Sequence, residues 1–313
     1  MFYNRLTDAG QTLKKHQRNK MKEKKRNRRD RYDGWFVEES DPMHNLMPYM
    51  IPNRADNEAV LAETIDMSAV EEYINKKNAD NPEFKYTFFH FIVAAFAKTI
   101  VLRPHMNRFY AGFRLYDRKE IVFAFNIKKK FSDEAEEVLA RIVFDKDSDE
   151  SPLEQIHGKI RDVVYSARKK GEDAATDQMN ILLKLPRPLL KIVVKILDWL
   201  DYHGKYPKDF YYVDPYFSSV FVSNLGSIKM HADYHHLANR GTNSIFLVIG
   251  EKGPTAFPKA DGTVEVKTGI KLGITIDERI ADGYYFSQTL KIVRKLFENP
   301  ELIEHNVNEP VEV

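Results

Sequence analysis

The residues best suited to chemistry lie together near the C-terminus, in the stretch Gly273-Ile-Thr-Ile-Asp-Glu-Arg-Ile-Ala-Asp-Gly283. Ile270 to Asp277 alternates as a strand does, and an amphipathic helix is predicted after Gly283. Between them lies a charged turn. Burying a cluster of polar side chains at the end of a strand costs free energy unless the side chains are paired with one another or serve a function. This turn is therefore the first candidate for an active site.

The surrounding pattern predicts the elements that would position this turn. An apolar, buried helix is predicted at 86–102, ending before Pro104, and Ser68 is expected to cap a short helix with Glu71 at the capping-box position. Helices on one side and mixed strands on the other indicate an α+β two-layer sandwich with a mostly antiparallel, mixed sheet. The remaining predicted helices are 69–77, 153–169 and 285–297, and the strands are 59–67, 108–116, 120–128, 138–144, 218–224, 244–250 and 270–277.

Five segments, in order, resemble the acyltransferase family that contains chloramphenicol acetyltransferase and the dihydrolipoyl acyltransferase cores. The turn resembles the family's Asp-His-Arg-x-x-Asp-Gly signature, and Phe221-Val-Ser-Asn-Leu-Gly226 resembles its Ile-Ser-Asn-Leu-Gly strand. One position departs, because Glu278 stands where the family has its catalytic His. The other similar segments are 88–108 (long helix and the turn after it), 243–250 and 296–300.

The resemblance implies a two-layer α+β fold, a homotrimer and an active site at the subunit interface. Coenzyme A, as the acyl donor, and a small-molecule acceptor would enter that site from opposite ends. The chain shows no lipoyl-attachment segment, so a stand-alone acyltransferase without a lipoyl group is expected.

Glu278 has two interpretations. As a retuned base it would take the acceptor's proton, although a carboxylate's reference pKa near 4.3 lies about two units below that of imidazole, and burial would have to raise it. As a paired residue, held by Arg279 or another cation, it would mark a catalytically inactive homologue that acts as a trimeric binding or scaffold protein. The sequence leaves both interpretations open.

The resemblance also implies roles for neighbouring residues. Ser223 matches the hydroxyl that hydrogen-bonds the tetrahedral oxyanion, a donor worth about 3 kcal/mol in the transition state. Asp282 matches a structural carboxylate, expected to be buried and paired with an Arg. Gly283 is expected to permit the tight turn into the helix. Asp277 and Arg279 should lie on one side of the strand and form a salt bridge.

His235 and His236 form a second candidate. By the resemblance they fall in a loop after the Ser223 strand, near the acceptor channel, where they could supply an imidazole from a new direction. A structural role in a polar loop is favoured. As metal ligands they are a poor pair, since adjacent side chains diverge and no third ligand is evident, so no metal is expected.

Two further segments stand apart from the family pattern. Residues 11–32 are densely basic, and a solvated arm or helix is favoured over one that binds nucleic acid or anionic lipid, because the run has no interleaved aromatic residues. Residues 1–33 are thus predicted to be an N-terminal arm, and 34–313 the acyltransferase-like domain. An extra amphipathic helix near 184–201 is predicted to pack on the core or a subunit, in preference to a membrane surface or a partner.

Composition limits the alternatives. The 313 residues carry a net charge of +2, which gives no strong field toward nucleic acid, and the absence of Cys excludes disulfides and thiolate chemistry. Glycine-rich nucleotide motifs, the Gly-x-Ser-x-Gly elbow and the His-Glu-x-x-His zinc motif are absent. The sequence has no signal-like N-terminus and no apolar run of membrane-spanning length, so a cytoplasmic protein is expected.

Overall fold

The computed structural model describes residues 27–38, 41–128, 137–170 and 182–313. The chain divides into two compact units, residues 1–30 and 31–313, and the fold described below is that of the second unit. Most of the predicted basic arm, residues 11–26, lies outside the described residues. Within the described residues, no helix is long and apolar enough to cross a membrane.

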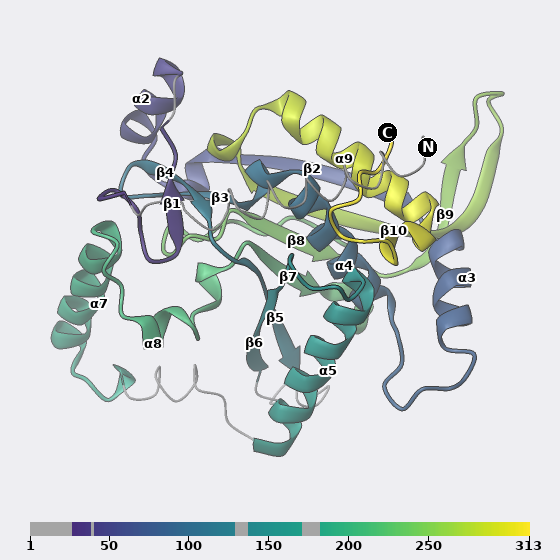
Figure 1. Cartoon of the computed structure of the whole chain (residues 1–313), viewed down its shortest axis with the longest axis horizontal. Coiled ribbons are helices and arrows are strands. Elements are labelled where there is room, and N and C mark those ends of the chain that lie inside the picture. Colours follow the sequence, from purple (N-terminus) through teal and green to yellow (C-terminus); the bar gives the residue numbers. More distant parts are fainter. Residues whose placement is uncertain (1–26, 39–40, 129–136, 171–181) are drawn as a thin grey trace, which may run out of the picture. The chain divides into compact units, whose positions relative to one another are not determined.

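One large mixed sheet forms the centre of the unit (Figure 1). Its neighbours are antiparallel except where β8 pairs with β7 and β7 pairs with β5, so the mostly antiparallel sheet predicted from the sequence is confirmed. A further strand, β9 (Gly253–Pro258), extends the first half of β10 as a hairpin. In spatial order the other strands are β2 (Glu58–Asp66), β10 (Val264–Asp277), β8 (Ile245–Ile249), β7 (Val220–Asn224), β5 (Ile121–Lys128) and β6 (Glu137–Phe144).

A layer of helices covers one face of this sheet, so the two-layer α+β prediction is also confirmed. The most central helix is enclosed almost all round, with every residue from His90 to Ile100 buried. Inward-facing strand residues such as Phe123, Leu247 and Ile274 pack against the helices in one continuous apolar core. The helices of the layer are α3 (Ser68–Lys77), α4 (Phe88–Leu102), α5 (Pro152–Lys170) and α9 (Gly283–Glu298).

Two predictions of local structure were wrong. Ser68 is the first residue of α3 rather than its cap, and the Asp66 carboxylate accepts from its backbone N–H. The strand predicted at 108–116 is instead a hairpin broken at Gly112 and Phe113, which both have positive φ. The pattern of apolar residues continues across this turn, which hides the break.

A smaller sheet and two outlying helices complete the unit. The hairpin consists of β3 (Arg108–Ala111) and β4 (Arg114–Arg118), and β1 (Gly34–Phe36) pairs with β4. Near it lie two helices, α2 and α7 (Figure 1). Their bounds, with those of the short α8, are α2 (Pro42–Met50), α7 (Arg187–Tyr202) and α8 (Lys208–Tyr211).

The sheet face opposite the helical layer, here called the outer face, is crossed by residues 230–241. Phe221, Phe246 and Val248 of the outer face form a small apolar cluster with Ala232 and Leu237 of this crossing segment. The approach is so close at Gly273 that a Cβ there would lie 2.2 Å from the backbone oxygen of Asp233. Glycine is required at that position because real Cβ atoms do not approach backbone oxygen so closely.

Candidate active site

The charged turn after β10, residues 277–283 and here called the signature turn, is built on a buried carboxylate. Asp277 is fully buried and accepts two hydrogen bonds from the Arg279 guanidinium, each 2.8 Å. Its carboxylate also accepts from the backbone N–H of Arg279, which closes the turn. The ion pair expected between these two side chains is therefore present.

A second buried cation, Arg54, lies beside this pair, with its Nε 3.5 Å from the Asp277 carboxylate. Its terminal nitrogens donate to the backbone oxygens of Tyr110, Ala238, Arg240 and Gly241. Burial lowers the pKa of Arg54 to about 10, and the neighbouring Asp277 opposes that shift. Arg54 thus ties β3 and the crossing segment to the signature turn.

Glu278, the residue in the place of the family's His, is exposed in the single chain. Arg279 is directed to Asp277 rather than to Glu278. Within the described ranges, the Glu278 carboxylate makes no hydrogen bond or ion pair. The paired, closed arrangement that one interpretation of the sequence required is not observed there.

Two expectations for the end of the signature turn were wrong. Asp282 was expected to be buried and paired with an Arg, but it is exposed and caps α9 by accepting from the backbone N–H of Tyr285 at 2.7 Å. Gly283 was expected to permit a tight turn, but its φ is not positive and a Cβ there would meet open space. Asp277, not Asp282, holds the buried carboxylate, because it lies at the end of a strand covered on both faces.

Ser223 lies on the outer face, two strands away from β10. Across β8 it is level with Val248 and Gly273. It is half-buried, and its hydroxyl has no hydrogen-bond partner among the residues that the structure describes. Glu278 follows Gly273 by five residues along the chain, at about 3.3 Å per residue, and Ser223 lies two strands away from Gly273, at about 4.8 Å per strand. The side chains of Glu278 and Ser223 in one copy therefore lie about 15 Å or more apart.

His235 and His236 lie on the same outer face. The His235 ring stacks on Phe246 with ring centroids 4.0 Å apart, and on His236 at 4.7 Å. Phe246 is level with Thr275 of β10. His235 therefore lies between the level of Ser223 and the signature turn, although both imidazoles remain exposed in the single chain. No group of three potential metal-ligating side chains occurs in the described part of the chain.

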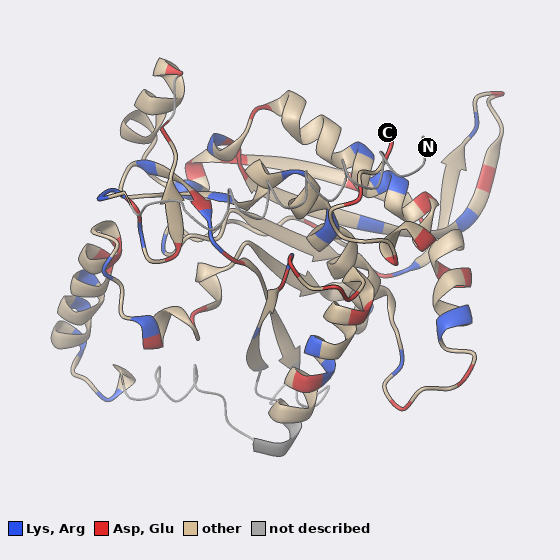
Figure 2. Cartoon of the chain, in the orientation of Figure 1, with Lys and Arg blue, Asp and Glu red and all other residues tan. Residues whose placement is uncertain are grey.

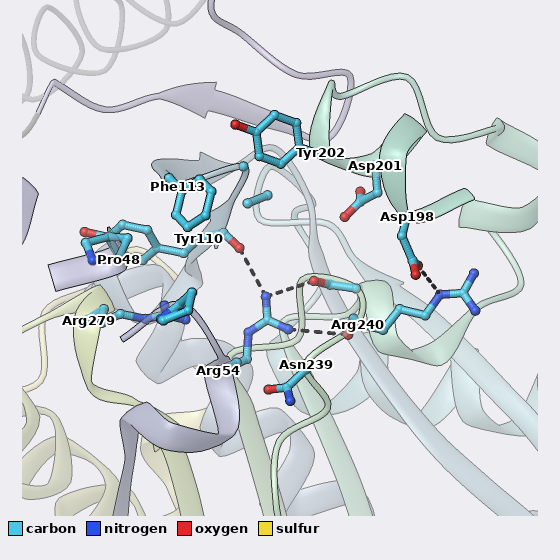
Figure 3. A pocket seen from close by; sticks show the side chains of 14 residues that line it. Pro48, Arg54, Tyr110, Phe113, Asp198, Asp201, Tyr202, Asn239, Arg240 and Arg279 are labelled. Atoms are coloured by element: carbon cyan, nitrogen blue, oxygen red, sulfur yellow. Dashed lines mark hydrogen bonds and ion pairs between the residues drawn. The ribbon is translucent and has the colours of Figure 1, made fainter. Parts of the chain in front are cut away.

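A pocket of about 420 Å³ opens next to the signature turn (Figure 3). Arg54 and Arg279 line it from the side of the turn, and Asp198, Asp201 and Tyr202 of α7 line it from the opposite side. In Figure 3 the Asp198 carboxylate pairs with the Arg240 guanidinium, at 3.6 Å. The sequence analysis missed this pocket, because its walls come from separate segments that share no local motif. The remaining lining residues are Pro48, Pro52, Tyr110, Ala111, Gly112, Phe113, Asn239 and Gly241.

The comparisons with known proteins bear on the fold. No family model matches the sequence, and no curated protein matches it. Among solved structures, a probable dihydrolipoamide acetyltransferase from Listeria monocytogenes superposes with a TM-score of 0.54 at 15% identity, covering 83% of this chain and 94% of its own.

Two further solved structures give the same result. The dihydrolipoamide acetyltransferase of Azotobacter vinelandii has a TM-score of 0.54 at 16% identity, covering 85% and 94% of the two chains. A chloramphenicol acetyltransferase has a TM-score of 0.52 at 11% identity, covering 84% and 99%. The chain therefore has the fold shared by chloramphenicol acetyltransferase and the dihydrolipoamide acetyltransferase catalytic domains.

Proposed function

We propose that the protein is a stand-alone acyltransferase that moves an acyl group from coenzyme A to a small acceptor, at a site formed between copies of the chain. The observation that carries the proposal is the free, exposed carboxylate of Glu278 at the signature turn of an acyltransferase fold. A carboxylate committed to a salt bridge would be unavailable as a base, and Arg279 is committed to Asp277 instead.

The order of the residues supports this assignment. In the Azotobacter enzyme a Ser, a His and an Asn were investigated for their role in the catalytic mechanism, and they follow this order along its chain, with the Asn four residues after the His. In the present chain Ser223, Glu278 and Asp282 follow the same order, and Asp282 is four residues after Glu278.

The distance between Ser223 and Glu278 supports the proposal of a site shared between copies. Side chains about 15 Å apart in one copy cannot both contact one reacting carbonyl, because a base and an oxyanion donor must each reach it within hydrogen-bond distance. A ring of three copies would place Glu278 of one copy against Ser223 of the next, which is the trimer that the family resemblance implies.

The chemistry would then proceed in two steps. Glu278 takes the proton of the acceptor's hydroxyl or thiol as the acceptor's oxygen or sulfur attacks the thioester carbonyl. Ser223 donates a hydrogen bond to the resulting oxyanion. When the tetrahedral intermediate collapses, the carbon–sulfur bond breaks and the departing thiolate of coenzyme A takes the proton back from Glu278.

An assay of free coenzyme A released from acetyl-coenzyme A, against a panel of small thiols, alcohols and amines, tests the reaction. We expect turnover by the wild type, a loss of about a hundredfold or more for Glu278→Gln, and a similar loss for Ser223→Ala. Glu72→Gln, a change at an exposed glutamate of α3, is the matched control and should retain activity. Background rates in all four proteins would refute the proposal.

A complementation assay tests the location of the site. Glu278→Gln and Ser223→Ala are each inactive alone, but co-expression should form mixed trimers in which about a quarter of the interfaces carry both wild-type residues. Recovery of about a quarter of the wild-type rate is expected. Failure to recover any rate, with mixed trimers demonstrated, would show that Glu278 of one copy and Ser223 of the next do not form a shared site.

The alternative, a trimeric binding or scaffold protein without catalysis, predicts a different pattern. Coenzyme A that binds the folded state raises the melting temperature by mass action. A clear shift accompanied by no turnover would indicate a site that binds without reacting, whereas no shift and no turnover would favour the scaffold.

A further inference from the structure

Among the described residues, helix α7 packs its apolar contacts with the rest of the unit around Leu197. Leu197 is buried and packs with Tyr206, Tyr211 and Phe217. A neighbouring flank of the helix is apolar yet exposed, at Leu189, Ile192, Ile196 and Trp199, with exposed fractions of 45%, 54%, 52% and 58%. Positions three and four residues apart share one face of a helix, so these four side chains form a continuous stripe, here called the α7 stripe.

A row of cations runs along the edge of the α7 stripe. Arg187, Lys191 and Lys195 recur every four residues and are all exposed. Of the two acidic residues of the helix, Asp201 accepts from Arg31 at 2.7 Å, whereas Asp198 shares the face of Lys191 and Lys195 and lies 3.6 Å from Arg240. Figure 2 shows α7 at the left edge of the view, with blue Lys and Arg segments along it.

Aromatic side chains continue this surface beyond the helix. The Tyr202 ring contacts Phe113 at the tip of the β3–β4 hairpin, and Phe113 stacks on Tyr49 of α2 with centroids 4.9 Å apart. Phe113 adopts a φ of 59°, a conformation that bulky residues rarely adopt. Such strain is retained where the surrounding structure or a function requires it, and here it presents an apolar ring at the surface.

We propose that the α7 stripe docks on an anionic lipid surface, a property that goes beyond acyl transfer. An in-plane amphipathic helix combines apolar and aromatic side chains on one side with Lys and Arg at the edge, and it lies in the headgroup region without crossing the bilayer. Trp and Tyr, as in Trp199 and Tyr202, favour that interface. A second copy of α7 fits less well, because two rows of Arg187, Lys191 and Lys195 would be brought together, and the one acidic residue on that face, Asp198, already lies beside Arg240.

Flotation of the full-length protein with vesicles tests the proposal. We expect binding to phosphatidylcholine vesicles that contain about one third phosphatidylglycerol, and little binding to phosphatidylcholine alone, with binding weakened by salt. Lys191→Glu with Lys195→Glu should reduce the partition coefficient about tenfold or more, as should Ile192→Ser with Ile196→Ser. Lys76→Glu with Lys291→Glu makes the same change in net charge at exposed lysines of α3 and α9, and it should reduce binding less than twofold.

Fluorescence gives a readout at the stripe itself. The chain has two tryptophans, so in a Trp35→Phe background the emission reports on Trp199 alone. A blue shift and protection from acrylamide upon addition of anionic vesicles are expected, because Trp199 would leave water. The residues 11–32 are unchanged in every variant, so they cannot account for a difference between the two lysine pairs.

Three results would overturn the proposal. The first is an emission of Trp199 that anionic vesicles do not change. The second is vesicle binding that both stripe variants leave intact, which would assign it to another part of the chain. The third is an oligomer that dissociates in Ile192→Ser with Ile196→Ser while the wild type ignores vesicles, which would show that a second copy covers the stripe.

Discussion

Asp277 is the residue on which the signature turn depends. It is buried between Arg54 and Arg279, and it supplies the one carboxylate that both guanidinium groups contact among the described residues. Removal of one partner from a buried ion pair leaves an uncompensated charge, which costs far more than the pair contributes.

We therefore expect Asp277→Asn to lower the free energy of unfolding by about 3–5 kcal/mol. Glu278→Gln, at the adjacent residue, should change the free energy of unfolding of the single chain by less than about 0.5 kcal/mol, because that side chain is exposed and unpaired within one copy of the described structure. Urea denaturation of both variants makes the comparison. Equal losses in the two variants would contradict the role assigned to Asp277.

The two glycines of the stretch 273–283 are also expected to differ in how much their substitution destabilises the fold. Gly273→Ala would place a methyl group 2.2 Å from the backbone oxygen of Asp233, so the crossing segment must shift, at a cost of about 1–3 kcal/mol. Gly283→Ala meets open space at the start of α9 and should be neutral or stabilising, since alanine is the better helix former. Melting temperatures of the two variants distinguish these effects. A stable Gly273→Ala protein would show that the segment is loosely held.

At the scale of an element, the start of α4 contains a buried histidine, His90, that must remain neutral for the helix to stay folded. Thr87 and His90 form a capping box, in which His90 Nδ1 accepts from the Thr87 backbone N–H at 3.0 Å. Burial lowers the pKa of His90 to about 3, and repulsion from His157 adds to the effect. Folded α4 thus requires a neutral imidazole over the whole range in which an exposed His would become charged.

The pH dependence of stability follows from that difference. The pKa of His90 is near 6.5 in the unfolded chain and lower in the folded one, so below pH 6.5 the unfolded state binds the extra proton. The free energy of unfolding should then fall as the pH decreases, by up to about 1.4 kcal/mol per pH unit from this group. Denaturation at pH 7 and pH 5 measures the loss.

His90→Gln keeps an acceptor at the capping-box position but cannot titrate. It should reduce the loss between pH 7 and pH 5 by about 1–2 kcal/mol, whereas His231→Gln, at an exposed residue, should not. The same pH dependence in wild type and His90→Gln would show that other groups account for it.

At the scale of the whole molecule, the boundary of the folded unit lies between Asp30 and Arg31. The sequence predicted an arm that ends at residue 33, because Arg31 continues the basic run. The structure instead buries Arg31, which donates to the Asp33 carboxylate at 2.8 Å and to that of Asp201 on α7 at 2.7 Å. Tyr32 packs edge-on against Tyr211 in the same cluster.

Two truncations test this boundary. Removal of residues 1–30 should leave the melting temperature of the remaining chain within about 2 °C of the wild type. Removal of residues 1–33 deletes the buried Arg31–Asp33 pair and leaves Asp201 without its cation, so a decrease of about 10 °C is expected. Thermal unfolding by circular dichroism compares them, and equal melting temperatures would show that Arg31 adds nothing to the fold.

The sequence by itself determined the fold class and the sheet, because alternation in 270–277 and the apolar run in 86–102 are local signals that burial reinforces. It also located the signature turn and predicted the ion pair of Asp277 with Arg279, although Arg279 lies in the 3-10 turn after β10 and not on the strand itself. Its errors at Gly112, Phe113 and Ser68 concern turns and caps, which depend on single backbone conformations rather than on periodicity.

Only the tertiary structure decided how these residues are used. Asp277, and not Asp282, is the buried carboxylate of the turn. Arg54, more than two hundred residues away in the sequence, lies against Asp277 and compensates its charge. The pocket beside the turn, the exposure of Glu278 and the free side of α7 likewise arise from segments that meet only in the folded chain. Contacts between residues distant in sequence leave no periodic signal, so the residues that could react were visible in the sequence, while their partners were not.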